Sequence, residues 1–124
     1  REAESARLLA LRERLVSGIL AAIPDVELTG HPTRRMPGHA SFLVHGADAQ
    51  SLLIALDLAG IAASSGSACA VGTPTASPVL TGMGFGATVA LGALRLTLGR
   101  ASTESDVEAV LAKLPGIVRA VRGR

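Results

Sequence analysis

Apolar residues recur at helical spacing near the start of the chain. Five of them fall three or four positions apart: Leu8, Leu11, Leu15, Ile19 and Ala22. This spacing places the apolar side chains along one face of an amphipathic helix. Pro24 ends the pattern, because proline lacks the N–H group that a helix interior requires. The sequence therefore predicts a helix that begins at the start of the chain, ends at Pro24 and packs through one face.

Shorter apolar stretches follow and predict strands around a second helix. Val26–Leu28 and Ser41–Val44 have the length and composition of strands. Leu52–Leu58 predicts a helix that stops at Gly60, since glycine tolerates the left-handed conformation common after a helix. Ile61–Ala63 predicts a short third strand.

Strict alternation predicts a fourth strand over residues 93–98. Three leucines fall on one face of it: Leu94, Leu96 and Leu98. Arg95 and Thr97 share the opposite face. Beyond this strand, Thr103 and Asp106 have the spacing of a helix cap, and Pro115 is expected to kink or restart the helix that follows. The fold expected is α+β, a small, mostly antiparallel sheet of about four strands covered by helices.

Composition narrows the classes of function. The 124 residues suffice for one domain, and 48% are hydrophobic with two Phe and no Tyr or Trp. The net charge of +2 comes without interleaved aromatic residues, so we expect no nucleic-acid partner. The uncharged stretch Leu58–Leu94 is broken by prolines and glycines, so we expect no membrane span. Charges near the N-terminus argue against a signal peptide and favour the cytoplasm.

Metal binding is not expected either. His31, His39 and His45 are spaced unlike a helical ligand pair or a compact metal knuckle. We interpret all three as polar surface or turn residues.

Cys69 is the only cysteine and follows a run of small residues, Ser64-Ser65-Gly66-Ser67-Ala68. A lone thiol excludes an internal disulfide and a sulfur-rich zinc site, which leaves packing or reactivity. The small neighbours favour reactivity, although no cationic residue in the loop would lower the pKa of the thiol.

Arg95 has two interpretations that its pattern does not separate. A guanidinium on a strand suits a carboxylate, because it donates two parallel hydrogen bonds and stays charged. A solvated, outward-facing arginine fits the same alternation equally well.

Two segments carry a family resemblance, Ser64-Ser65-Gly66-Ser67-Ala68-Cys69 and Leu94-Arg95-Leu96-Thr97-Leu98-Gly99-Arg100. Together they resemble the C-terminal, small domain of the NifS/IscS-like cysteine desulfurases. These are class V aminotransferase-like enzymes of fold type I that use pyridoxal phosphate. The resemblance extends over nearly the whole chain.

The resemblance implies roles for named residues. Cys69 matches the catalytic cysteine, which takes sulfur from L-cysteine as a persulfide and leaves L-alanine. Arg95 matches the arginine that binds the substrate carboxylate, and residues 64–68 match the cysteine loop (Ser64, Ser65, Gly66, Ser67 and Ala68). The family further implies a homodimeric parent that delivers sulfur to an acceptor such as an iron–sulfur scaffold protein, for cluster assembly or thiolation.

The cofactor lysine of the family, which follows a histidine, has no counterpart in this chain. The only lysine is Lys113, in the pattern of the last helix, where we expect a solvated side chain. We therefore expect residues 1–124 to be a single C-terminal domain of a larger enzyme, inactive alone, whose large domain binds pyridoxal phosphate. Pro74 and Pro78 stand where relatives commonly have one proline, which predicts a stiffer loop after Cys69.

Two other functions remain open at this point. The chain could be a stand-alone persulfide carrier or interaction module, in which Cys69 only receives sulfur from another protein. Within the enzyme class, a selenocysteine lyase is the nearest alternative.

Overall fold

The computed structural model describes residues 2–30, 37–61, 63–65, 85–90 and 93–123. These residues form three helices and five strands. In chain order the elements are α1 (Glu2–Ala22), β1 (Val26–Thr29), β2 (His39–Val44), α2 (Ala49–Leu58), β3 (Ala63–Ser65), β4 (Phe85–Ala90), β5 (Ala93–Leu98) and α4 (Glu104–Arg122). The strands make one sheet in the order β1-β2-β5-β4-β3. Neighbouring strands are antiparallel except β3 and β4, which are parallel.

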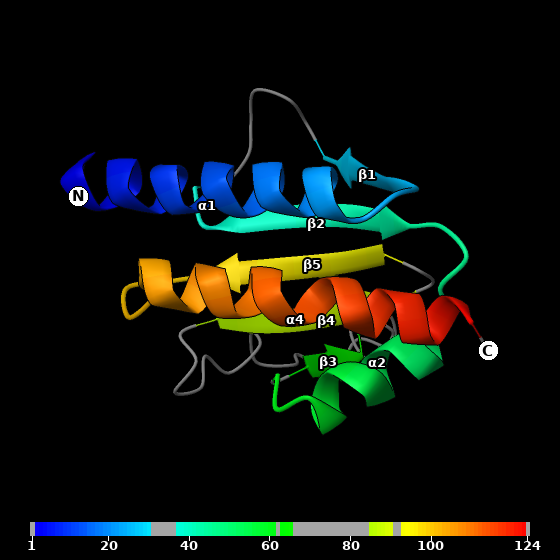
Figure 1. Cartoon of the computed structure of the whole chain (residues 1–124). Coiled ribbons are helices and arrows are strands. Elements are labelled where there is room, and N and C mark those ends of the chain that lie inside the picture. The colour runs from blue at the N-terminus through cyan, green and yellow to red at the C-terminus, as the bar shows by residue number, and fades with distance from the viewer. Residues whose placement is uncertain (1, 31–36, 62, 66–84, 91–92, 124) are drawn as a thin grey trace.

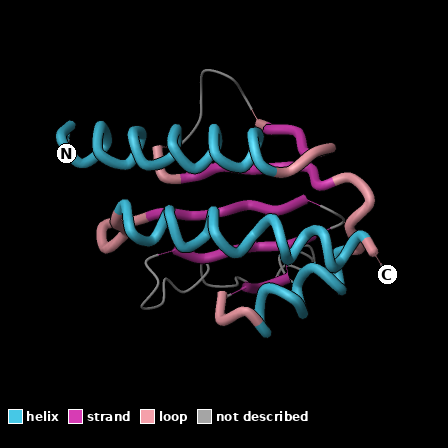
Figure 2. Tube along the Cα trace, in the orientation of Figure 1, coloured by secondary structure: helices cyan, strands magenta, loops and turns pink. Residues whose placement is uncertain are grey.

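The molecule has two layers, a sheet and a layer of helices on one of its faces (Figure 1). Helices α1 and α4 contact each other and run side by side along the strands, while α2 lies beside α4 near β3. The same arrangement is visible in the Cα trace, where no described helix lies on the far side of the sheet (Figure 2). One face of the sheet is therefore covered by helices, and we call the other its open face.

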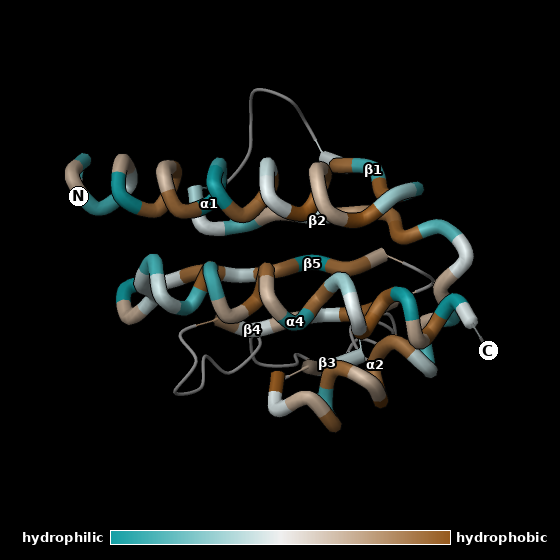
Figure 3. Tube along the Cα trace, in the orientation of Figure 1, coloured by the Kyte–Doolittle hydropathy of each residue, from teal (hydrophilic) through white to brown (hydrophobic). Residues whose placement is uncertain are grey.

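The core fills the space between the two layers. Alternate residues of the middle strands are buried toward the helices: Ala40, Phe42, Val44, Phe85, Ala87, Val89, Leu94, Leu96 and Leu98. Buried residues of α1 and α4 meet them from the helical side. In Figure 3 hydrophobic and hydrophilic stretches alternate along both helices, as expected for helices with one buried face. Since aromatic residues are so few, this core is mostly aliphatic.

The α+β class predicted from the sequence is confirmed, with two differences in the sheet. Its five strands exceed the four expected, because β4 lies in the uncharged stretch, where glycine, alanine and threonine give no alternation of apolar and polar residues. The third strand begins at Ala63, whereas Ile61 is buried and its amide donates to the Leu56 carbonyl at the end of α2.

The ends of the helices follow the sequence signals. The Asp48 side chain caps α2, and Gly60 after that helix has a φ of 83°. Thr103 and Asp106 form a reciprocal capping box at the start of α4, as predicted. Pro115 does not restart that helix, which continues from Glu104 to Arg122. None of the helices within the described ranges is long and apolar enough to cross a membrane.

Two arginines fasten the helices to loops at opposite ends of the molecule. Arg7 of α1 donates to the carbonyls of Gly99, Arg100 and Ser102, at 3.2, 3.0 and 2.6 Å. Near the C-terminus, Arg122 donates to the carbonyls of His45 and Asp25, at 2.8 and 2.9 Å. These guanidinium groups hold the turns around the sheet in place.

Candidate functional site

Arg95 lies on the open face of the sheet, in the middle of its width. It is exposed, whereas Leu94 and Leu96 on either side are buried in the core. Its partners in the register are Ser41 on β2 and Thr88 on β4. Because directly paired residues point to the same face, all three side chains share the open face. The sheet therefore presents its central guanidinium away from the helices, as the alternation predicted.

Hydroxyl residues extend this row in both directions. Ser41 pairs with Thr29 of β1, and Thr88 pairs with Ser64 of β3. Five residues thus form a row across the sheet. Arg95 is the charged residue in it, and the other four are serine or threonine. Short hydroxyl side chains leave a long guanidinium uncovered, and they offer a ligand both hydrogen-bond donors and acceptors.

Three buried polar atoms beside Arg95 have no hydrogen-bond partner among the described residues. They are Nδ1 of His39, Oγ1 of Thr88 and Oγ1 of Thr97. His39 and Thr97 are paired across β2 and β5, two residues along each strand from the pair of Ser41 and Arg95, and therefore on the same face. Buried polar atoms are nearly always paired in native proteins, so unpaired atoms gathered at one place mark a site that requires a further partner.

Burial and the charge of Arg95 both affect the pKa of His39. Partial burial lowers the pKa of its imidazole below the ordinary value, and the positive charge of Arg95 lowers that pKa further. The neutral form is therefore favoured near neutral pH. This differs from the sequence prediction of a polar surface or turn residue, since His39 begins β2 and is partly buried.

The backbone under His39 is held from the helical side. Arg12 of α1 is 1% exposed, and its Nε donates to the His39 carbonyl at 2.7 Å while Nη1 bonds to Glu13 at 2.9 Å. Gly38 accepts a 2.7 Å hydrogen bond from the Leu98 amide. Two contacts from different elements thus fix the start of β2, and with it the position of the imidazole.

The described part of the predicted cysteine loop consists of Ser64 and Ser65, which lie in β3. Gly66, Ser67, Ala68 and Cys69 lie outside the described residues, as do Pro74 and Pro78. The structure therefore does not test the prediction for Cys69. It does place the strand that leads toward this cysteine on the same sheet as Arg95, with β4 between them.

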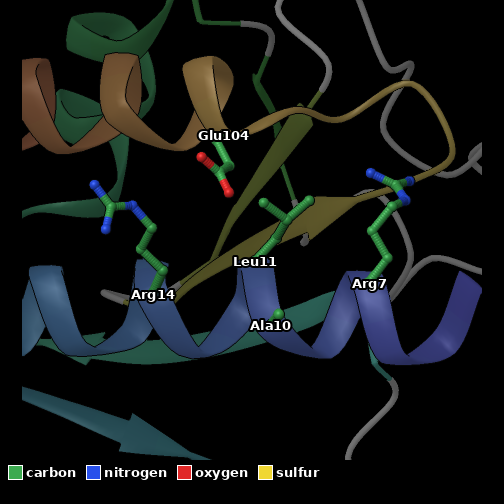
Figure 4. A pocket seen from close by; sticks show the side chains of 5 residues that line it. All are labelled: Arg7, Ala10, Leu11, Arg14 and Glu104. Carbon is green, nitrogen blue, oxygen red and sulfur yellow. The ribbon is translucent and has the colours of Figure 1, made fainter. Parts of the chain in front are cut away.

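A cavity of about 270 Å³ lies on the other side of the molecule, between α1 and the start of α4. In Figure 4 Glu104 points from α4 toward Leu11 of α1, with Arg7 and Arg14 on either side. Both arginines are already paired, Arg7 with Glu4 at 3.0 Å and Arg14 with Glu108. Because its cations are neutralised locally, this cavity is a poor anion site compared with the open face.

Lys113 does not fit the role of a cofactor lysine. It lies on α4 in the helical layer, and its Nζ donates to the Ala59 carbonyl at 3.3 Å. Arg95 faces the opposite side of the sheet. No group of described residues has the composition of a metal site. Arg95 is therefore the candidate cation of the open face for an anionic ligand, while the amine of Lys113 lies away from it in the helical layer.

His39 and Thr88 were not singled out as site residues from the sequence. The imidazole neighbours Arg95 only through the pairing of β2 with β5, and Thr88 only through the pairing of β4 with β5. The alternation in residues 93–98 predicted on which face of the strand Arg95 lies, but it did not predict which strands flank that strand.

Comparisons with known proteins agree with this fold. A NifS-like protein from Rickettsia africae has a solved structure that matches 94% of this chain and 29% of its own, with a TM-score of 0.69 and 24% identity. An IscS-like cysteine desulfurase of Mycobacterium tuberculosis is 48% identical over 122 residues, and the cysteine desulfurase NifS of Azotobacter vinelandii is 38% identical over 121. Each alignment covers 98% of this chain.

The chain spans about 31% of the length of the Mycobacterium relative and 30% of the Azotobacter relative. The model of the aminotransferase class-V family matches residues 2–110, which is most of the chain. Given this match and the shared fold, the chain belongs to the aminotransferase class-V family.

Proposed function

We propose that this chain is the C-terminal domain of a pyridoxal-phosphate-dependent cysteine desulfurase, with Arg95 as the binding residue for the substrate carboxylate and Cys69 as the sulfur acceptor. One observation carries the proposal: among the described residues the central guanidinium of the open face has no carboxylate partner, and polar atoms without a hydrogen-bond partner lie beside it. The names of the Mycobacterium and Azotobacter relatives support the choice of reaction.

The reaction assigned to this chain is a sulfur transfer. The Cys69 thiolate attacks the sulfur of L-cysteine, and a new S–S bond forms as the C–S bond of the substrate breaks. The electron pair stays on the substrate carbon, which takes a proton, so that the products are a Cys69 persulfide and L-alanine. Since Lys113 is engaged elsewhere, the cofactor belongs to a separate large domain in this proposal.

The segment between Ser65 and Cys69 is long enough for Cys69 to act on a substrate that is bound to Arg95. β3 and β5 are two strand spacings apart, about 10 Å. Cys69 follows Ser65 by four residues, which span at most about 14 Å when extended. A substrate whose carboxylate is bound to Arg95 is therefore within range of the thiol. The Arg95 fork can donate two hydrogen bonds to the carboxylate and orient the substrate before its sulfur is attacked.

The partners and location of the whole enzyme belong to the same proposal. The persulfide sulfur would pass to an acceptor protein such as an iron–sulfur scaffold. The parent enzyme would be a homodimer in the cytoplasm.

A chimera tests the function. The third of the Mycobacterium relative that aligns with this chain is replaced by the chain itself, and alanine formed from L-cysteine is measured after loading with pyridoxal phosphate. We expect turnover in the chimera and none after Cys69→Ser, with cofactor absorbance unchanged. Turnover retained by Cys69→Ser would exclude the assigned role of this thiol.

The carboxylate role has its own control. Arg95→Gln should raise KM for L-cysteine about 10- to 100-fold, since a hydrogen bond to a charged group contributes about 1.5 to 3 kcal/mol. Arg100→Gln is the matched control, because Arg100 is an exposed arginine just beyond β5. An equal KM in both variants would remove Arg95 from the binding site.

A chimera that binds cofactor but makes no alanine would favour the persulfide carrier instead.

A further inference from the structure

Arg95 and His39 are diagonal neighbours on the open face. His39 pairs with Thr97, and Arg95 is two residues before Thr97 on the same strand. Side chains in this relation are about 7 to 8 Å apart at their backbone positions, so two charges on them interact directly. Arg95 is always charged, whereas an imidazole changes its charge near neutral pH. The two residues therefore form a fixed cation beside a titratable one.

Among the described residues, Arg95 is the charged group that acts most strongly on His39. On the open face, the residues flanking His39 in the register are Ser41 on its own strand and Thr97 opposite, both neutral. On the helical side, Arg12 contacts the His39 carbonyl, and Glu13 balances the charge of Arg12. Of the charges in the described ranges, that of Arg95 lowers the pKa of His39.

Thr97 can stabilise the protonated imidazole. Nδ1 of His39 and Oγ1 of Thr97 are both buried and have no hydrogen-bond partner in the described ranges, and they belong to directly paired residues. A neutral histidine can leave Nδ1 without a proton, but the charged form carries a proton on both ring nitrogens. The threonine hydroxyl opposite is then an available acceptor for the new N–H group.

We propose that carboxylate binding at Arg95 is coupled to proton uptake from solvent by His39, so that the open face holds an amino-acid carboxylate more tightly as the pH falls. This inference rests on the proposed function, because it takes Arg95 as the carboxylate site. A bound carboxylate offsets the positive charge that disfavours protonation of His39. By linkage, the protonated imidazole then strengthens the binding of the same carboxylate.

The test follows the ring signals of His39 by NMR through a pH titration of the 124-residue chain. Titrations are run in sodium acetate and in sodium chloride at equal ionic strength, and His39→Asn assigns the signals. We expect acetate, compared with chloride, to raise the His39 midpoint by roughly half a pH unit, the effect of a unit charge about 7 Å away in water-like surroundings. His45 is the internal control, since it is exposed and paired with Glu27.

Arg95→Gln provides the second arm. Without the guanidinium charge, the His39 midpoint should rise even in chloride, and acetate should no longer change it. The variant removes an exposed side chain, so the fold is expected to persist, and the strand signals verify this. A His39 midpoint that is the same in the Arg95→Gln variant and in the native chain would overturn the coupling.

The remaining outcomes separate this inference from the proposed function. If acetate shifts the Arg95 Nε signal but leaves the His39 midpoint unchanged, the coupling is wrong and the carboxylate role of Arg95 stands. If acetate affects neither residue, the coupling is wrong in this chain, and the KM of the Arg95→Gln chimera decides independently whether Arg95 binds substrate.

Discussion

The backbones of Gly38 and Leu98 approach so closely that a side chain at position 38 has no room. A Cβ atom at Gly38 would lie 2.4 Å from the Leu98 carbonyl oxygen. The Leu98 amide donates to the Gly38 carbonyl at 2.7 Å. The two residues thus lock the start of β2 against the end of β5, directly before His39 and close to Arg95.

Gly38→Ala should therefore destabilise the chain. Neither backbone can move without breaking this hydrogen bond, so we expect a loss of about 1 to 3 kcal/mol in the free energy of unfolding. Urea denaturation followed by circular dichroism measures it. Gly123→Ala is the control, because its φ is −81° and the nearest atoms to an added Cβ are 3.6 Å away or farther. Equal midpoints for the two variants would contradict the close approach.

Arg12→Met should cost stability, whereas Arg14→Met should not. Both arginines lie on α1 and contact a glutamate. Arg12 is buried and also bonds the His39 carbonyl, so its replacement should lower the free energy of unfolding by about 1.5 to 3 kcal/mol. Arg14 is 54% exposed, and an exposed ion pair contributes about 0 to 1 kcal/mol. Urea midpoints compare the two variants, and a larger loss for Arg14→Met would refute this ranking.

Asp48→Ala should remove a pH-dependent part of the stability. The backbone amide of Ser51 donates to the Asp48 carboxylate at 2.9 Å, and this bond holds the pKa of Asp48 below its usual value. Because the folded-state pKa is the lower one, the contribution is present above about pH 4 and disappears as the pH falls through the folded-state pKa. Thermal melts should differ between native and variant chains at pH 6 and converge toward pH 2. A constant difference would exclude the ionised cap as the cause.

His39 should make the chain less stable in mild acid. Its pKa is lower in the folded state than in the unfolded state, so between the two values the unfolded chain binds more protons. Stability is then complete above about pH 6.5 and decreases as the pH falls below it. His39→Asn should flatten this dependence between about pH 7 and pH 5 in urea titrations. His45→Asn is the control, and an identical pH profile for native and His39→Asn chains would refute the prediction.

The sequence alone determined the local elements and the chemistry they carry. Period-two alternation set Arg95 opposite Leu94 and Leu96, because successive side chains of a strand point to opposite faces. Likewise, Thr103 and Asp106 indicated the start of α4, since a cap depends only on residues within one turn. The family resemblance rested on two contiguous segments, and the family match over residues 2–110 confirmed it.

Tertiary structure alone decided which strands meet. The pairing of β5 with β2 and β4 brings His39, Ser41 and Thr88 to Arg95 from positions 56, 54 and 7 residues away, counted from the register. No local pattern records such pairs, because a strand's partners are chosen by the fit of the whole buried face against the helices. The sequence thus supplied the guanidinium and its direction, while the fold of the sheet supplied its neighbours, among them His39, whose pKa the charge of Arg95 lowers.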